Sequence, residues 1–459
     1  MITYSIIQKS QLEGGLRLDA EYYQPEYLDL EEKLNSLQTK TIEEISKSVV
    51  SFGAYSLTSH IEWQESGVPY VNVGDIHDGY IDLDNVKYIS EKVDEILKKS
   101  RVNNGQVLLT MAGTIGNAAV AHNLPKRVNA NQAIAKITPL DNTPYYLAAF
   151  LNSKYGLLQT QREIVSSVQA NIFLGPIKKF RVPIFNQEIT NEIANKYKIF
   201  LNELENSKHL YSQAENLLLE ELGLRDFKVK DELSYIVNLS EIKSAHRADA
   251  EYFQPIYKNL ESRIKNFEYK RLDEIFSIRR GDFINPDYYV ERAKRGYIRI
   301  KELPVKGDIN SDAITYIDDN FPGRNLDILQ EGDFVFAGIG ATLGKTARIS
   351  KELEGFFYSN NTVRFRLKND WKYKVDIRYS QAVLQSMICQ LQFEQRQAQT
   401  AQAKIADEEL KTVLIPILPK PIQQKIADLV QKSHEARKKA KQLLEQAKYK
   451  VEQLIESKK

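Results

Sequence analysis

The sequence predicts an α+β protein in which one domain occurs twice and two long helices join the copies. The first observation is a repeated segment, since residues 16–34 read LRLDAEYYQPEYLDLEEKL and residues 246–264 read HRADAEYFQPIYKNLESRI. Both copies lie in one chain of 459 residues, at an interval of 230. An internal repeat of this kind indicates a duplicated structural unit. The other two observations are further matched segments and two helical stretches without glycine or proline.

The repeat continues through the strand-like and turn-like segments of each half. Residues 70–73 match residues 297–300, and both alternate β-branched or aromatic residues in the manner of a strand. The remaining matches are 105–109 with 332–336, 113–116 with 341–344, 131–132 with 360–361, 167–172 with 400–405, and 182–184 with 415–417. The interval drifts only between 227 and 233, which indicates loop insertions around an unchanged core.

A long helix is predicted after each domain. No glycine or proline interrupts residues 187–222, and Gly223 suits the position just after a helix. The second helix is expected to begin at Pro421, because proline is favoured at the first helical position. The predicted organisation is a first domain over 1–185, a helix over 186–222, a second domain over 223–417 and a helix over 418–459.

Both helices carry an apolar seam in one heptad frame, which predicts a coiled-coil pair. Alternating steps of four and three pass through Ile193, Tyr197, Phe200, Leu204, Ser207, Tyr211, Ala214 and Leu218. The same frame 233 residues later passes through Ile426, Val430, Ser433, Arg437, Ala440, Leu444, Ala447, Val451 and Leu454. Arg437 interrupts the second seam.

Each helix leaves one domain toward the other, so we expect them to be antiparallel in a pseudo-twofold molecule. A helix of about 35 residues spans roughly 50 Å, which is about 15 base pairs of duplex DNA. The duplicated domains and the shared frame favour helices that set a spacing. The alternative is a plain helical spacer between two unrelated binding modules.

Composition excludes several classes of protein. No apolar run approaches the ~18 residues of a membrane span, and residues 1–10 lack the pattern of a signal peptide. The single cysteine, Cys389, excludes an internal disulfide and suits the cytoplasm. The net charge is only +2, so contacts to nucleic acid must come from local basic patches.

No catalytic constellation stands out. Gly344-Lys345-Thr346 resembles the end of a phosphate-binding loop, but the glycine that this loop needs five positions earlier is Ile339. Residues 285–288, Asn-Pro-Asp-Tyr, are interpreted as a turn, and residues 75–78 as a polar loop with no metal site. The chain is therefore predicted to be non-catalytic, with no cofactor or metal of its own.

The two halves differ most in the segment before the strand at Tyr70 or Tyr297. The second half carries basic and aromatic candidates for contacts to phosphates and guanine edges, namely Arg279, Arg280, Tyr288, Tyr289, Arg292, Lys294, Arg295, Arg299 and Lys301. Its counterpart, residues 52–75, has no lysine or arginine and offers Tyr55, Thr58, Ser59 and His60. Different loops on one frame predict two different targets. The alternative is a solvated charged loop.

Amide side chains recur at matched places in the two halves. Asparagine and glutamine can hold adenine through two hydrogen bonds at its major-groove edge. These candidates are Asn131, Gln132, Gln169, Asn360, Asn361 and Gln402, and Asn72, Thr114, Asn171 and Lys404 complete the DNA-binding set. A shared structural role, such as capping a turn, explains the recurrence equally well.

The order of these segments resembles the specificity subunit of type I restriction–modification systems. The marks are Asp-Ala-Glu-Tyr-x-Gln-Pro near the start of each half, residues 107–116 and 333–344, the two Gln-Ala-x-Ile segments, and Ile-Pro-Ile-Leu-Pro-Lys-Pro-Ile-Gln-Gln before the last helix. The resemblance covers essentially the whole chain. Residues 185–188 lack the prolines that are usual before the first long helix, so its start is expected only to within a few residues.

The resemblance implies that each domain is a target-recognition domain for one half of a bipartite site in double-stranded DNA. The helices would fix the gap between the half-sites. Two methyltransferase subunits would dock along them and methylate adenine N6 with S-adenosylmethionine, and restriction subunits would bring an ATP- and Mg²⁺-dependent nuclease. Two other classes stay open: a bivalent adaptor between protein partners, and the recognition half of a single-chain restriction–methylation enzyme.

Overall fold

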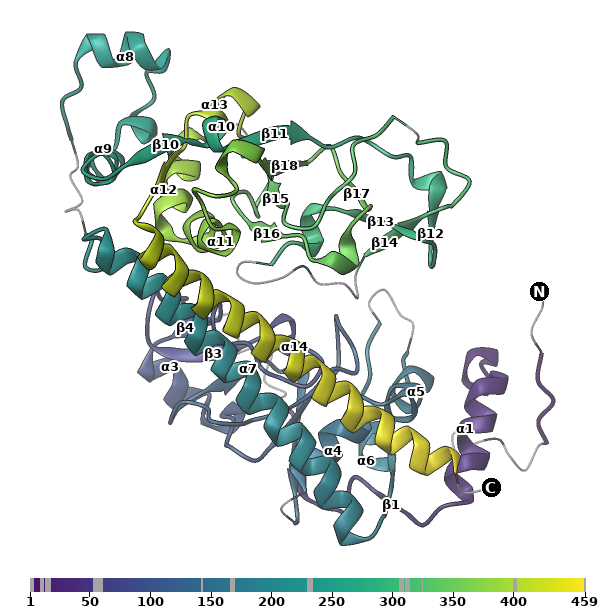
Figure 1. Ribbon diagram of the computed structural model, residues 1–459. Coiled ribbons are helices and arrows are strands. Elements are labelled where there is room, and N and C mark those ends of the chain that lie inside the picture. Colours follow the sequence, from purple (N-terminus) through teal and green to yellow (C-terminus); the bar gives the residue numbers. More distant parts are fainter. Residues whose placement is uncertain are drawn as a thin grey trace. The chain divides into compact units, whose positions relative to one another are not determined.

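The computed structural model describes residues 4–8, 12, 18–52, 61–141, 143–165, 170–228, 234–304, 309, 314–323, 325–398 and 403–457 (Figure 1). The chain divides into two compact units. Unit 1 combines Met1–Glu205 with Arg437–Lys459, and unit 2 is Asn206–Ala436. Each unit mixes helices and strands, which confirms the predicted α+β class. Each unit also contains part of both long helices.

Unit 1 is built on two small sheets. The first has the antiparallel order β2 (Ser46–Val50), β8 (Ile134–Pro139), β5 (Val107–Thr110), β6 (Ala118–Val120). The second has the order β4 (Lys87–Ile89), β3 (Val68–Val71), β7 (Asn129–Ala130), in which β3 and β7 are parallel. A separate pair joins β1 (Thr39–Thr41) to β9 (Arg181–Pro183).

Unit 2 repeats this arrangement. Its larger sheet has the order β11 (Phe276–Arg280), β18 (Thr362–Leu367), β15 (Phe334–Ala337), β16 (Thr346–Arg348). Its other sheet has the order β12 (Tyr289–Val290), β14 (Thr315–Ile317), β13 (Arg295–Ile298), β17 (Phe357–Tyr358), and β10 (Tyr269–Arg271) pairs with β19 (Leu414–Pro416). Two residues, one from each unit, are called matched positions below when they hold the same place in corresponding strand pairs.

Short helices cover the sheets in both units. In unit 1 they are α1 (Pro25–Asn35), α3 (Glu91–Ile96), α4 (Pro144–Leu151), α5 (Lys154–Arg162), α6 (Leu174–Lys179), and the 3-10 turns η2 (Ala20–Tyr23), η3 (Val73–Asp75) and η4 (Lys98–Ser100). In unit 2 they are α8 (Leu239–Ala245), α9 (Pro255–Ile264), α10 (Leu272–Ile275), α11 (Ile377–Gln385), α12 (Met387–Arg396), α13 (Asp407–Lys411), η5 (Ala250–Phe253), η6 (Pro286–Tyr288), η7 (Ile300–Glu302), η9 (Lys351–Leu353) and η10 (Asn369–Trp371).

The repeated Asp-Ala-Glu-Tyr-x-Gln-Pro segment has the same local structure in both units. It forms a 3-10 turn, η2 or η5, and its proline then opens α1 or α9 at the first helical position. That position needs no backbone N–H donor and suits the fixed φ of proline. The sequence repeat therefore corresponds to a repeat of structure.

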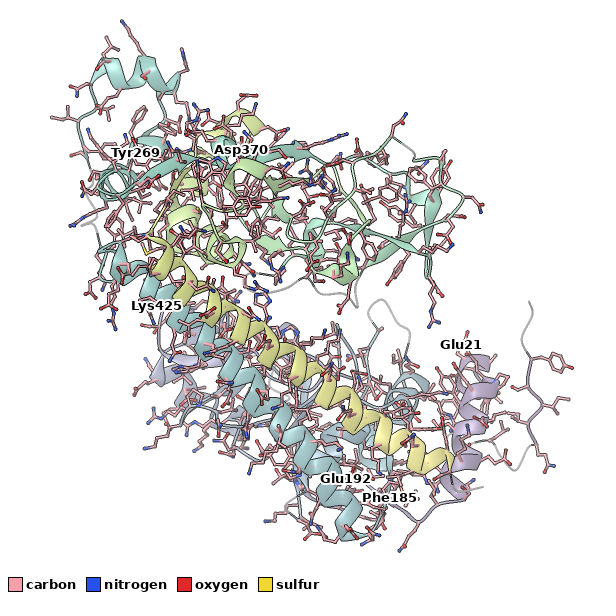
Figure 2. All side chains as sticks on the ribbon, viewed as in Figure 1. Glu21, Phe185, Glu192, Tyr269, Asp370 and Lys425 are labelled. Atoms are coloured by element: carbon pink, nitrogen blue, oxygen red, sulfur yellow. The ribbon has the colours of Figure 1, made fainter. Side chains whose placement is uncertain are left out.

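The two long helices are α7 (Gln187–Glu221) and α14 (Lys420–Glu456). Asn186 caps the start of α7, because its Oδ1 accepts a hydrogen bond from the Ile189 N–H at 2.9 Å. Phe185 precedes this cap and Glu192 lies inside the helix (Figure 2). Gly223 follows the helix with φ +63°, as its predicted role requires.

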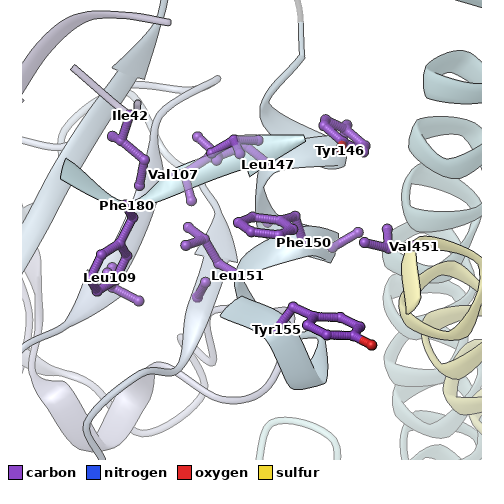
Figure 3. Close-up of a cluster of buried hydrophobic side chains, with 14 of the residues drawn as sticks. Ile42, Val107, Leu109, Tyr146, Leu147, Phe150, Leu151, Tyr155, Phe180 and Val451 are labelled. Carbon is purple, nitrogen blue, oxygen red and sulfur yellow. The ribbon is translucent and has the colours of Figure 1, made fainter. Parts of the chain in front are cut away.

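Most of the predicted seam is buried in both units, while Leu204, Arg437 and Leu454 are half-buried. In unit 1, Ile193 and Tyr197 of α7 and Ala447 and Val451 of α14 are fully buried in one hydrophobic core. Figure 3 shows Val451 beside Phe150 of α4 in that core. In unit 2, the core takes in the seam residues Tyr211, Ala214, Leu218, Ile426 and Val430.

Within each unit the two helices are antiparallel. In unit 1 the Lys439 Nζ lies 2.6 Å from a Glu203 oxygen and the Lys450 Nζ lies 3.5 Å from a Glu192 oxygen, so residue numbers rise on one helix as they fall on the other. In unit 2 the Ser433 Oγ donates a hydrogen bond to the Ser207 carbonyl oxygen at 2.7 Å. None of the helices in the described ranges combines the length and apolar character that a membrane crossing requires.

Candidate nucleic-acid interface

In unit 1, backbone hydrogen bonds bring the matched loop segments to one edge. The Asn131 N–H donates to the Val71 carbonyl at 2.9 Å, which places residue 131 beside the end of β3. The Met111 N–H donates a hydrogen bond to the Ala133 carbonyl oxygen at 2.9 Å, and Ala112 forms an isolated β-bridge with Asn171. The candidates that these bonds bring together are Asn72, Thr114, Asn131, Gln132 and Asn171.

Unit 2 builds the same edge with the same bonds. The Ser359 N–H donates to the Ile298 carbonyl oxygen at 2.9 Å, and the Gly338 N–H donates to the Asn361 carbonyl oxygen at 3.0 Å. Ile339 bridges to Lys404. The two units therefore join their segments in the same way. The predicted match of residues 131–132 with 360–361 is wrong by one position, because the bonds and the strand register match Asn131 with Ser359 and Gln132 with Asn360.

Several candidates are engaged inside the protein. Asn72 closes a capping box with Asp75, whose Oδ2 accepts from the Asn72 N–H at 2.7 Å. Burial raises the pKa of the Asp75 carboxyl, while its hydrogen bonds from Asn72 act in the opposite direction. At the matched position, the Arg299 N–H donates to Glu302 Oε2 at 2.7 Å, and its guanidinium pairs with the buried Glu302 at 3.2 Å. Asn131 Oδ1 accepts from the Ala133 N–H at 2.8 Å.

Arg280 holds the edge of unit 2 together. Its guanidinium pairs with Asp407 and donates to the carbonyl oxygens of Ile405 at 3.2 Å and Asn360 at 3.5 Å. A side chain added at Gly338 would meet Arg280 Nη1 at 2.9 Å. Arg280 therefore ties the two segments at Asn360 and Ile405 to the end of β11, and its role in the structure is to position them.

Other candidates of unit 2 are available to a ligand. The exposed ones are Arg279, Arg292, Lys294, Arg295, Lys301, Asn360, Asn361 and Lys404. Tyr288 is 37% exposed, whereas the half-buried Tyr289 donates its hydroxyl to the Ile284 carbonyl at 3.2 Å. The Arg295 guanidinium carbon lies 5.4 Å from the centre of the Phe357 ring. Exposed cations beside aromatic rings suit contacts to a phosphate backbone.

Unit 1 presents a different surface at the matched edge. Thr114 is exposed, and Gln132 is half-buried with its amide oxygen unbonded within the described part of the chain. Tyr55, Thr58, Ser59, His60, Gln169 and Gln402 lie outside the described residues. The amide oxygen of Gln132 is itself buried, so Thr114 is more accessible than Gln132.

The sequence-based prediction missed Trp63 and Lys87. Trp63 is 45% exposed, and the Lys87 Nζ lies 4.8 Å from the centre of its ring. Lys87 belongs to β4, the neighbouring strand, and not to the loop segment that was compared between the halves. The available signal in the sequence was a tryptophan in the segment before the strand at Tyr70.

The alternative sites considered from the sequence have structural explanations. Asn285 Oδ1 accepts from the Asp287 N–H at 3.2 Å, which makes residues 285–288 a turn. Asp75 caps η3, and the Asp78 carboxylate lies 2.8 Å from Lys448 Nζ. Over the ranges that the structure describes, no three His, Cys, Asp or Glu side chains are grouped so that they could hold a metal ion.

Fold and geometry thus define a protein with two units that build the same edge from matched segments. A family profile described as type I restriction modification DNA specificity domain matches residues 36–216 and again residues 264–448, so the chain belongs to that family. Both copies of the duplicated domain match separately. This confirms the resemblance seen in the sequence.

A curated relative is the type I restriction enzyme EcoBI specificity subunit of Escherichia coli, 28% identical over 137 residues. That match covers 29% of this chain and 28% of the relative, so it spans little more than a quarter of either protein. Among solved structures, the type I restriction–modification S subunit from M. genitalium is 14% identical, with 90% of this chain and 95% of that chain covered and a TM-score of 0.41. The HsdS subunit from Thermoanaerobacter tengcongensis is 12% identical, with 91% and 96% covered and a TM-score of 0.29.

Proposed function

We propose that this chain is the DNA-recognition subunit of a type I restriction–modification complex and reads a bipartite site in duplex DNA. Each unit would read one half of the site. The observation that carries this proposal is the duplicated edge, where the same backbone bonds present different side chains in the two units. One backbone frame with two sets of exposed groups suits two different base sequences.

The chemistry would belong to partner subunits. Two methyltransferase subunits would dock along α7 and α14 and transfer a methyl group from S-adenosylmethionine to adenine N6 in a cytoplasmic complex. Restriction subunits would supply the ATP- and Mg²⁺-dependent cleavage. This chain would contribute the DNA sequence specificity of the complex, in keeping with a family of DNA specificity domains.

The helices would set the gap between the half-sites. Both are continuous, over 35 residues in α7 and 37 in α14, so a change in their length would be transmitted without a break. Removing one heptad around Ser207 and the facing heptad around Ser433 would keep the antiparallel frame. The helices would shorten by about 10 Å, or about three base pairs. If the preferred site keeps the same gap between its half-sites, the helices do not set that gap.

The decisive test is a map of N6-methyladenine in host DNA. The chain would be co-expressed with the methyltransferase gene beside it, and single-molecule sequencing would locate the methylated adenines. A split motif with two short defined halves and a fixed gap would support the proposal and identify the target. If a complex that assembles and binds S-adenosylmethionine produces no methylation, the bivalent protein adaptor becomes the better explanation.

A further inference from the structure

We propose that Trp63 and Lys87 form a contact to the sugar–phosphate backbone of duplex DNA in unit 1. This inference rests on the proposed function and adds a cationic contact on the side of the molecule where residues 52–75 supply none. Trp63 is 45% exposed, and Lys87 is exposed with its Nζ 4.8 Å from the centre of the tryptophan ring. An open aromatic ring with a cation beside it offers a ligand an apolar face and a positive charge together.

Backbone pairing fixes the position of the pair. Gln64, next to Trp63, bridges to Tyr88, which places Trp63 and Lys87 on neighbouring segments of one small sheet. The Trp63 ring lies edge-on to Tyr70 of β3, with centroids 5.3 Å apart. The arrangement therefore does not depend on a flexible loop.

The pair lies beside the candidate edge of unit 1. Tyr70 is two residues before Asn72, whose Nδ2 donates to the Tyr70 carbonyl at 3.4 Å. Side chains two residues apart on an extended segment share one face. Trp63 packs on Tyr70 and so lies next to the face that carries Asn72.

Unit 2 has an aromatic side chain, Tyr289, at the place of Trp63, but the place of Lys87 is taken by Thr315. The cation nearest to Tyr289 comes from another position and is used internally. Tyr289 lies 5.9 Å from Tyr297, and the Arg299 guanidinium carbon lies 5.6 Å from the Tyr289 ring. Arg299 is paired with Glu302, and the Tyr289 hydroxyl is bonded to Ile284. In contrast, Lys87 makes no ion pair with any residue in the described ranges. Only unit 1 leaves both members available.

The chemistry of the pair suits a phosphodiester. The Lys87 ammonium is a compact point charge of the kind that neutralises a phosphate and releases a counterion. The indole offers an N–H donor for a phosphate oxygen and a flat apolar face for the deoxyribose. Such contacts position a protein on DNA without reading its sequence.

Tryptophan emission provides a direct test, because the chain has only two tryptophans, Trp63 and Trp371. A duplex that carries the methylated motif would be titrated into the full chain and into its W63F variant. We expect a DNA-dependent change of emission in the original protein that W63F loses. The K87Q variant should bind the duplex about threefold to tenfold more weakly, with a salt slope lower by about 0.9, the change for one phosphate contact. K40Q, an exposed lysine on the separate strand β1, should bind as the original protein does.

Each other result would count against the contact in a distinguishable way. Salt-dependent DNA binding with the same emission change in W63F and the same affinity in K87Q would overturn the contact and leave the proposed function standing. An emission change on adding the methyltransferase subunit without DNA would show that the pair is a protein contact. The absence of any salt-dependent DNA binding by the assembled complex would overturn both proposals.

Discussion

The two units differ in side chains where their backbones agree most closely. Asn72 and Arg299 hold matched positions, and in each the backbone N–H donates to a carboxylate three residues later at 2.7 Å. Asp75 and Glu302 therefore fix the turn in the same way. Because the turn depends on the acid and on the backbone, the residue at its start is free to change from an amide to a guanidinium. Recognition can diverge on this frame without a change of fold.

The loops around the two edges differ in the side chains that hold them. In unit 2, Arg280 ties the loops at Asn360 and Ile405 to β11 through its guanidinium. The matched place in unit 1 is Ser51, one residue after β2, and its side chain is too short to join two loops in this way. Both units share backbone bonds at this edge, such as Asn131 to Val71 in unit 1 and Ser359 to Ile298 in unit 2. Unit 2 adds the side-chain bonds of Arg280 to them.

The largest effect is expected from replacing Arg280, whose guanidinium holds the loops at the edge of unit 2. R280A should weaken DNA binding at the half-site of unit 2 by at least about tenfold, because the loops at Asn360 and Ile405 lose their common anchor. Unit 2 should also lose about 1–2 kcal/mol of unfolding free energy, a value reduced by the partial exposure of the Arg280–Asp407 pair. Footprinting of the two half-sites and thermal unfolding would measure both effects.

Two controls separate positioning from direct contact. R280K keeps the charge but loses the planar fork, so it should lose affinity nearly as R280A does. S51A, at the matched place in unit 1, should change neither half-site. Full binding by R280K would show that charge alone matters and that Arg280 contacts phosphate.

Much of the fold was predictable because its signals are local. The seam follows the spacing of apolar residues, and Gly223 and Asn186 mark helix ends through backbone chemistry. Side-chain partners are a different case. Arg280 forms an ion pair with Asp407, 127 residues later in the chain. Trp63 contacts Lys87 because the pairing of two strand segments brings them together. Neither partnership has a local signature, so the sequence identified basic and aromatic candidates without distinguishing those that are engaged from those that are free.

A second prediction concerns the free cations of unit 2. Replacing Arg292, Lys294 and Arg295 together by glutamine should lower the salt slope of DNA binding by up to about 0.9 for each phosphate that the variant no longer neutralises. All three are exposed, so the melting temperature should hardly change. K372Q, an exposed lysine elsewhere in unit 2, is the matched control. An unchanged slope would mean that the cluster is a solvated surface, the alternative considered from the sequence.

A third prediction uses a difference in the cores. Gln381 on α11 is fully buried, and neither polar atom of its amide has a hydrogen-bond partner among the described residues. The matched position in unit 1 is Ala148, since Tyr146 and Tyr379, two residues earlier, both donate to a proline carbonyl. An unsatisfied buried amide is costly. Q381L should therefore stabilise unit 2 by about 1–2 kcal/mol.

Thermal unfolding would test this, with a rise of about 2–4 °C expected per kcal/mol. The contrasting variant is Q385L, four residues later, because Gln385 donates to the Thr346 carbonyl and accepts from the Tyr211 hydroxyl. Q385L should destabilise unit 2. A lower melting temperature for Q381L would reveal a bound water that satisfies the amide.

The smallest effect concerns a buried cation at matched positions of β8 and β18. In unit 2, Arg364 pairs with Asp327 at 2.7 Å. In unit 1, the partners of the buried Lys136 within the described residues are the carbonyl oxygens of Lys99 and Arg101, at 2.7 and 2.9 Å. Burial lowers the pKa of Lys136 to about 8. The ordinary value of 10.5 then applies to the unfolded chain.

Between these two pKa values the unfolded state holds a proton that the folded state has released, so the unfolding free energy rises with pH from about 8 to about 10.5. Below pH 8 the contribution is constant. Relative to K136M, the original protein should gain on the order of 1 kcal/mol across this window. K136R should show no such gain, since a guanidinium keeps its proton there. Chemical denaturation at several pH values would measure the difference, and equal slopes for all three proteins would mean that water reaches Lys136.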